Sequence, residues 1–134
     1  MGRILCAFVV MFVCGCGGSQ SEAIRRGVGA ECNANLACTE SGQACLTEFK
    51  GGYCGVSACL HDTDCPQGSA CVTDDGQTNY CFLVCLDKPE CNVRRSLDNE
   101  SSCTSSLTFV DGTMGRKVCR PPLSGTPTVD AGTD

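Results

Sequence analysis

The sequence predicts a small disulfide-rich fold: three tandem four-cysteine units, each with a short β-hairpin, and little or no helix beyond an N-terminal signal peptide. Cysteine supplies 15 of the 134 residues, a density typical of covalently stapled scaffolds. Trp is absent and Tyr occurs only twice, so an apolar core would be thin, and small domains with thin cores usually depend on disulfides. The cysteine spacing also repeats, and this repeat defines the units.

The repeat begins at Cys32, Cys59 and Cys85, and each of these residues is followed, after five intervening residues, by a second cysteine. We therefore divide this region into unit 1 (32–58), unit 2 (59–84) and unit 3 (85–120). The twelve cysteines that we expect to form disulfides are, unit by unit, Cys32, Cys38, Cys45 and Cys54; Cys59, Cys65, Cys71 and Cys81; and Cys85, Cys91, Cys103 and Cys119.

Residues between the cysteines support the same register. Unit 1 contains GQACLTE from Gly42, and unit 2 contains GSACVTD from Gly68. The only two tyrosines, Tyr53 and Tyr80, each stand immediately before a fourth cysteine. Unit 3 keeps the cysteine order but is longer and has diverged from the other two.

A turn signal between the third and fourth cysteine of each unit predicts a β-hairpin. The signals are Lys50-Gly51-Gly52, Asp75-Gly76 and Asp111-Gly112, and Gly suits the positive φ that such turns require. In unit 3 we expect the flanking segments SLTFV and GRKV to extend the two strands. The segments between the first and second cysteines are short and polar, which indicates turns.

Four cysteines allow three pairings in each unit, and the sequence does not choose among them. We expect each unit to close on itself with two disulfides, each stabilising the fold by about 2–4 kcal/mol. Zinc is the alternative use for these thiols, but structural zinc sites typically contain CxxC knuckles or paired histidines. The chain has no CxxC and a single histidine, His61, so we expect neither a metal nor a cofactor.

Residues 1–15 have the features of a bacterial export signal. One cation, Arg3, precedes an apolar stretch over residues 4–13, which as a helix would span only about 15 Å, half of a hydrocarbon core. The tripeptide VCG before Cys16 resembles the bacterial lipobox, although Ala or Ser is usual where Cys14 stands. The resemblance implies that Cys16 is lipid-modified and is the first residue of the mature chain.

The sequence is compatible with two alternative cleavage sites. Removal of residues 1–15 leaves twelve cysteines besides the lipidated Cys16, and all twelve can then pair. Cleavage after Ala23 also leaves twelve and would give a freely secreted protein. We favour lipidation because Cys16 stands at the right distance from the apolar run, and acyl chains would hold the protein stably on a membrane.

The segments that flank the three units lack large apolar runs. We expect residues 16–31 to form the lipid anchor and a flexible linker, because the segment contains Gly and Ser and has no apolar period. We expect residues 121–134 to form a disordered tail.

Unit 2 carries the motif CLHDTDCPQGSAC from Cys59 to Cys71. It is similar to the C-x-x-D-x-D-C…G-x-x-C repeat of cysteine-rich, myxobacterial-type bacterial lipoproteins, and to the Dickkopf N-terminal and EB-module class of extracellular repeats. Unit 1 departs from the motif with Asn35 and Ala37 in place of the acids, and unit 3 departs with Lys88. The resemblance implies an extracytoplasmic, disulfide-rich repeat protein of a kind used mainly as an interaction module.

The only candidate for a catalytic base is His61, which stands beside Asp62 and Asp64. We interpret it as a solvated loop residue, since no nucleophile signature accompanies it, and we expect no enzyme activity. The two aspartates are expected to organise an Asx-type turn before Cys65. A weak calcium site is the minor alternative.

A basic pair, Arg94 and Arg95, lies in the widened loop between Cys91 and Cys103. A disulfide-bounded loop that presents a basic residue is a common bait for trypsin-like proteases, because preorganisation lowers the entropy cost of binding. The other interpretation is a solvated charge pair.

Removal of a leader that holds Arg3 leaves nine cationic side chains against fifteen acidic ones. This balance disfavours nucleic-acid binding and electrostatic attachment to anionic lipid. We therefore expect a non-catalytic lipoprotein, held by its lipid on a bacterial outer membrane or cell surface, whose units serve in adhesion or bind an unknown protein or glycan ligand. The alternative is a secreted protease inhibitor that acts through the Cys91–Cys103 loop.

Overall fold

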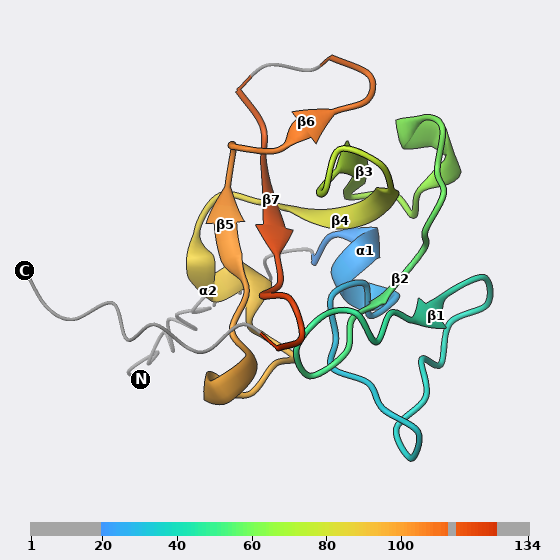
Figure 1. Cartoon of the computed structure of the whole chain (residues 1–134), viewed down its shortest axis with the longest axis vertical. Coiled ribbons are helices and arrows are strands. Elements are labelled where there is room, and N and C mark those ends of the chain that lie inside the picture. Colours follow the sequence, from blue (N-terminus) through green and yellow to red (C-terminus); the bar gives the residue numbers. More distant parts are fainter. Residues whose placement is uncertain (1–19, 113–114, 126–134) are drawn as a thin grey trace, which may run out of the picture.

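A computed structural model describes residues 20–112 and 115–125 of the chain (Figure 1). The helices are α1 (Glu22–Arg25) and α2 (Lys88–Cys91), with 3-10 turns at Asp62–Asp64 and Leu97–Asn99. The strands are β1 (Ala44–Cys45), β2 (Cys54–Gly55), β3 (Ser69–Thr73), β4 (Asn79–Cys85), β5 (Ser102–Thr104), β6 (Thr108–Phe109) and β7 (Lys117–Arg120). The prediction of a small disulfide-rich fold with short hairpins and little helix is confirmed.

The third and fourth cysteines of every unit face each other across a hairpin. β1 pairs with β2, β3 with β4, and β5 with β7, and all three pairings are antiparallel. The directly opposed residues are Cys45 and Cys54, Cys71 and Cys81, and Cys103 and Cys119. The repeated cysteine spacing therefore specifies one hairpin register, which the chain uses three times.

The opposed cysteines are bonded not to each other but to the segment that precedes their hairpin. In each unit the first cysteine bonds to the third and the second to the fourth, so each unit closes on itself as expected. The six disulfides are Cys32–Cys45, Cys38–Cys54, Cys59–Cys71, Cys65–Cys81, Cys85–Cys103 and Cys91–Cys119. Both strands of each hairpin are thereby tied to the turn-rich segment before it.

Units 2 and 3 share one antiparallel sheet with the strand order β5-β7-β4-β3-β6 (Figure 1). β7 pairs with β4, which places Val118 opposite Val84. The expectation that the segment SLTFV lengthens its own hairpin is wrong. Its strand β6 pairs with β3 instead, with Phe109 opposite Val72. This pairing places Phe109 against the core around the fully buried Val72. Units 2 and 3 therefore form a single body.

One hydrophobic core joins all three units. Phe49 and Tyr53 of unit 1 pack edge-on against Phe82 of unit 2, with ring centroids 5.6 and 5.2 Å apart, and Tyr80 stacks on Phe82. The Tyr53 hydroxyl accepts a hydrogen bond of 3.1 Å from the backbone N–H of Leu83. The polar tip of this buried ring is thus satisfied, as buried tyrosines require.

The expectation of a flexible linker over residues 16–31 is wrong for its described part, residues 20–31. The Ser21 hydroxyl caps α1 by accepting a hydrogen bond from the Ile24 N–H, and Ala23 is fully buried. α1 packs on unit 2, where a Cβ added at Gly68 would lie 2.9 Å from the Cβ of Ser21. A helix of four residues is too short to give a periodic apolar pattern, which is why the sequence did not reveal it.

The expectation of a disordered tail over residues 121–134 is likewise wrong for its described part, residues 121–125. Pro121 is fully buried, and Leu123 forms a β-bridge with Phe49. The backbone N–H of Lys50 donates to the carbonyl of Pro122 over 2.8 Å. The remainder of the predicted tail lies outside the described residues.

Gly52 shows why the turn in unit 1 requires glycine. Its φ is +69°, and an added Cβ would lie 2.1 Å from the carbonyl oxygen of Cys32 and 2.7 Å from the Cys32 sulfur. Both the backbone conformation and the close approach of the first disulfide exclude any side chain there.

Candidate functional site

Cys16, the predicted site of lipidation, and the predicted leader of residues 1–15 lie outside the described residues. Within the part of the chain that the structure describes, no helix is long and apolar enough to cross a membrane. Of the other predicted site residues, the twelve cysteines are paired. Arg94 and Arg95 lie in one loop between α2 and the 3-10 turn at Leu97–Asn99.

Arg95 is buried, with only 9% of its surface exposed, so the expectation of two exposed arginines is wrong for this residue. Its guanidinium donates to four backbone carbonyls. These belong to Asn99 at 2.7 Å, Lys50 at 2.8 Å, Gly52 at 2.9 Å and Gly29 at 3.1 Å. A guanidinium can do this because it presents five N–H donors in one plane. Arg95 therefore joins unit 3 to unit 1 and to the N-terminal segment, and it is not available as protease bait.

Arg94 is exposed, in contrast to its neighbour. Its backbone carbonyl accepts a hydrogen bond of 3.1 Å from the Glu31 N–H, which holds the loop against the N-terminal segment. Its guanidinium lies beside Gly27, where an added Cβ would come within 2.9 Å of Nη1. Arg94 thus presents its charge from a backbone that is held in place.

A groove of about 300 Å³, the Arg94 groove, lies where the N-terminal segment, unit 1 and unit 3 meet. Arg26 and Arg94 contribute cations to its lining, and Leu36 and Ala37 contribute apolar surface. The side-chain carbonyl of Gln43 is buried and has no hydrogen-bond partner among the described residues, while its amide donates to the Arg26 carbonyl. The groove therefore combines charged side chains with apolar surface, which are features of ligand sites.

Glu31 contributes the acidic group of the Arg94 groove. Its Oε1 accepts hydrogen bonds from the N–H and the hydroxyl of Ser96 at 2.6 and 2.7 Å. Burial acts to raise the pKa of Glu31, but the hydrogen bonds from Ser96 outweigh it and the pKa is lowered. Glu31 is thus charged at neutral pH. Since Arg26 is paired with Glu22 over 2.7 Å, the groove presents the opposite charges of Arg94 and Glu31.

His61 belongs to a polar cluster that ties unit 2 to the segment between β6 and β7. Its Nδ1 lies 3.0 Å from one oxygen of Asp111, and the other oxygen accepts a hydrogen bond of 2.7 Å from the Asp62 N–H. The Asp62 carboxylate in turn accepts a hydrogen bond of 2.6 Å from Arg116. The hydrogen bond to Asp111 raises the pKa of His61. The imidazole is 67% exposed, as expected of a loop histidine, but it has a structural partner that the sequence did not reveal.

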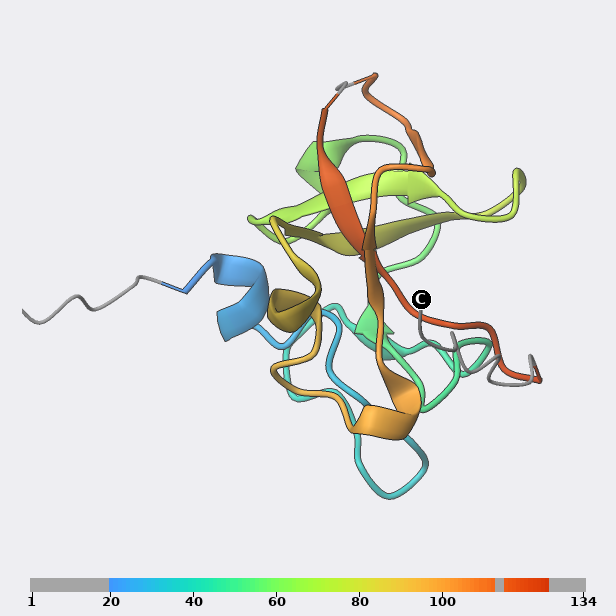
Figure 2. The same cartoon turned by 90° about the vertical axis from the view of Figure 1, so that its left-hand side faces the viewer.

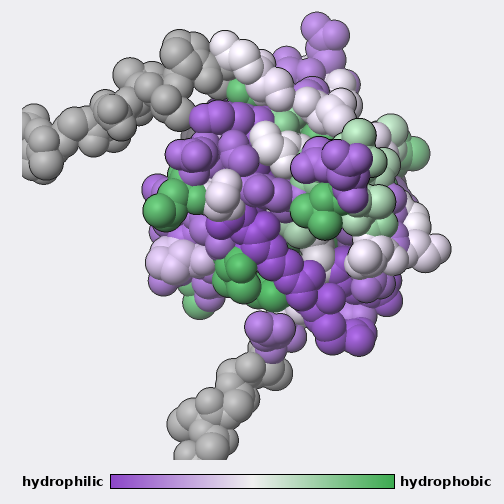
Figure 3. All heavy atoms as spheres, turned by 90° about the horizontal axis from the view of Figure 1, so that it is seen from below, coloured by the Kyte–Doolittle hydropathy of each residue, from purple (hydrophilic) through white to green (hydrophobic). Residues whose placement is uncertain are grey.

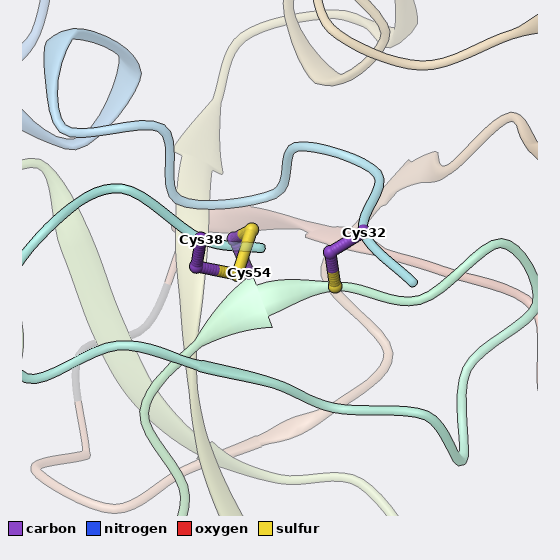
Figure 4. Close-up of side chains that lie close together, drawn as sticks. All are labelled: Cys32, Cys38 and Cys54. Atoms are coloured by element: carbon purple, nitrogen blue, oxygen red, sulfur yellow. A yellow bond between two sulfur atoms is a disulfide. The ribbon is translucent and has the colours of Figure 1, made fainter. Parts of the chain in front are cut away.

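Three cysteine sulfurs gather in unit 1, those of Cys32, Cys38 and Cys54 (Figure 4). They lie within 4.8 Å of one another, and similar clusters occur in units 2 and 3. Cys38 is bonded to Cys54, and Cys32 is bonded to Cys45. Because cysteine binds metals as a thiolate, these clusters are neighbouring disulfides that would offer metal ligands only after reduction.

The surface seen from below is mostly hydrophilic, with separate hydrophobic patches (Figure 3). Half of the large exposed apolar residues of the described chain lie in the first part of unit 3. The full set is Leu36, Leu60, Leu86, Val93, Leu97 and Leu123. Apolar exposure is thus concentrated around α2 and the loop that follows it.

The sequence did not reveal the Arg94 groove. Leu36 and Gln43 stand over fifty residues from Arg94 in the chain, and only tertiary packing brings them together. The one local signal was the basic pair itself. The prediction of an exposed cation is correct for Arg94 and wrong for Arg95, which is buried.

Comparison of the chain with protein-family models, with curated proteins and with solved structures gave no match. The chemistry of the chain's own residues therefore carries the functional conclusion.

Proposed function

We propose that this protein is a non-catalytic cell-envelope lipoprotein, held on a bacterial outer membrane or cell surface through acyl chains on Cys16, and that its disulfide-stapled units bind a protein or glycan ligand. The six disulfides agree with an oxidising, extracytoplasmic compartment. The lipobox-like tripeptide before Cys16 supports the anchor.

The observation that carries the proposal is the burial of Ala23. The rival cleavage after Ala23 would cut α1 after its second residue and remove the Ser21 cap. It would also remove a side chain with no exposed surface, together with the Ala23 carbonyl, so the Val28 N–H would lose its hydrogen-bond acceptor at 2.9 Å. A mature chain that begins at Cys16 keeps this element whole.

Expression in a diderm bacterial host tests the anchor. We expect the wild-type protein in the membrane fraction, soluble only in detergent, and a Cys16→Ser variant in the aqueous fraction. Both should contain all six disulfides, because the twelve paired cysteines are the same. A wild-type protein that is found only in the aqueous fraction would overturn the proposal.

The Arg94 groove is the part of the surface best suited to hold a ligand. An arrayed set of glycans and peptides, probed with wild-type protein, Arg94→Ala and Arg25→Ala, tests this assignment. Arg25 is the matched control because it is an exposed arginine on α1 and pairs with Glu22 instead of lining the groove. Binding lost in Arg94→Ala alone supports the groove, and equal binding by all three proteins contradicts it.

The inhibitor alternative now depends on Arg94 alone, since Arg95 is buried. It is favoured by the exposed Arg94 side chain on a backbone held by Glu31. Inhibition of trypsin by micromolar wild-type protein, lost in Arg94→Ala, would support it. Rapid cleavage after Arg94, or no inhibition, would exclude it.

A further inference from the structure

The folded part of the chain begins much closer to Cys16 than the sequence predicts. α1 is capped at Ser21, so only four residues separate Cys16 from the ordered domain. Even a fully extended chain covers only about 3.4 Å per residue, so five steps reach at most about 17 Å. If Cys16 carries acyl chains, α1 is therefore held close to the lipid headgroups.

Two exposed apolar side chains stand next to α2, the helix that lies near α1. Leu86 is 80% exposed and Val93 is 59% exposed, and they flank α2 on both sides. Figure 2 shows α1 and α2 near each other at one side of the molecule, and a small hollow between them is lined by Ile24 and Val93. The region around α1 and α2 thus presents two exposed apolar side chains that contact with lipid would remove from water.

The same region lacks the negative charge of the rest of the protein. Residues 20–31 and 86–95 together hold five cations and four acids, whereas the whole chain has a net charge of −5. The remaining surface therefore carries the acidic excess. An anionic bilayer would repel that surface and tolerate the region around α1 and α2.

We propose that the α1–α2 face, residues 20–25 and 86–93, lies against the membrane that holds the lipid of Cys16, with Leu86 and Val93 at the level of the headgroups. This inference rests on the proposed lipid anchor. It sets the orientation of the domain: the β3–β4 turn, at the opposite side of the molecule in Figure 2, points away from the bilayer.

Tryptophan fluorescence tests the orientation cleanly because the chain contains no Trp. Leu86→Trp, Val93→Trp and Gln77→Trp each place one reporter at an exposed position, and Gln77 lies in the β3–β4 turn as the matched control. The lipidated full-length proteins are reconstituted into vesicles of phosphatidylethanolamine and phosphatidylglycerol, with and without phosphatidylcholine brominated on its acyl chains.

We expect bromine to quench the reporters at positions 86 and 93 at least twofold more than the reporter at position 77, with blue-shifted emission. Equal quenching at all three positions, in proteins that float with the vesicles, would overturn the orientation and leave the anchor intact. Failure of every protein to float, as expected of Cys16→Ser, would overturn the anchor and this inference together.

Discussion

Unit 1 and the pair formed by units 2 and 3 use the same cysteine pattern, but strand pairing contributes far less to the attachment of unit 1. Units 2 and 3 are joined through their main chains, because β7 pairs with β4 and β6 pairs with β3. In unit 1 the strands β1 and β2 have two residues each and form a separate two-stranded sheet. Its main chain meets unit 2 only in a short stretch after β2, where the Cys81 N–H donates to the Val56 carbonyl and Ser57 forms an isolated bridge with Tyr80. Its other connections are made by side chains and by the segments that flank the repeats.

Those flanking segments replace the missing strands around unit 1. The Gly29 N–H donates to the carbonyl of Cys54, and the Cys54 N–H donates to the carbonyl of Ala30. On the other side, Leu123 bridges to Phe49. Arg95 then binds carbonyls from both unit 1 and the N-terminal segment. The spacing of the cysteines thus determines each hairpin, while residues other than the cysteines determine how each hairpin is attached to the rest of the molecule.

Loss of Arg95 should have the largest effect, because it removes the main polar link between units 1 and 3. Arg95→Met leaves three carbonyls of unit 1 and the N-terminal segment without their donor, and we expect a loss of about 3–5 kcal/mol in the free energy of unfolding. Arg94→Met is the control and should change this free energy by no more than about 0.5 kcal/mol. Guanidinium denaturation without reductant measures both, and equal stability of the two variants would contradict the role of Arg95.

Two disulfides of equal span, one in unit 1 and one in unit 2, test whether the two units are attached differently. Cys38–Cys54 and Cys65–Cys81 both span 16 residues, so chain entropy alone predicts the same loss of about 3 kcal/mol when either is replaced by two alanines. Hydrogen exchange should differ: removal of Cys38–Cys54 should expose mainly unit 1, whereas removal of Cys65–Cys81 should expose both units of the shared sheet. An identical exchange pattern in the two variants would contradict the distinction.

The ion pair of Asp74 and Arg120 strengthens the junction of units 2 and 3. The Asp74 side chain is 2% exposed and lies 2.6 Å from the Arg120 Nε. Burial raises the pKa of Asp74, while Arg120 opposes this effect. We expect Arg120→Ala to cost about 1–2 kcal/mol at pH 7, because a buried carboxylate loses its partner.

The pH dependence of Arg120→Ala gives the check. A folded-state pKa above the unfolded value means that stability falls as pH rises through the folded pKa. Without Arg120 that pKa should rise further, so the deficit measured by denaturation should shrink when the pH is lowered from 7 to 4. A deficit that is the same at both pH values would show that the pair is not electrostatically coupled.

The smallest effect is expected at His61, which is exposed. Its hydrogen bond with Asp111 raises the pKa of His61, so its stabilising contribution is present below the unfolded value near 6.5 and is lost as pH rises through the folded pKa. NMR titration should give a pKa above 6.5 in the wild type and a lower value in Asp111→Asn. The assignment is simple because the chain has a single histidine, and an unchanged pKa would refute the contact.

The cysteine spacing was sufficient to predict the units, their hairpins and their closure by two disulfides each. The turn before Cys65 was also predictable from local residues, since the Asp64 carboxylate accepts from the N–H groups of Leu60 and His61. These features depend on contacts within a single unit, at most 28 residues apart, where spacing and turn chemistry carry the information.

The rest depends on contacts between distant residues and could not be read locally. Arg94 and Arg95 look alike in sequence, yet one is solvated and the other binds carbonyls up to 66 residues away. Ala23 and Pro121 lie in segments with the composition of linkers, yet both residues are fully buried. The hairpins are too short to cover the core by themselves, and the flanking segments pack against it. Low apolar content in a flanking segment therefore did not mean disorder in this chain.

The intact mass of the native mature protein, measured before and after reduction and alkylation, is the most direct test. A chain that begins at Cys16, with diacylglyceryl and acyl groups and with twelve thiols that appear only on reduction, is the predicted result. An unlipidated chain that begins at Ile24, with α1 cut, would contradict both the anchor and the structural role assigned to Ala23.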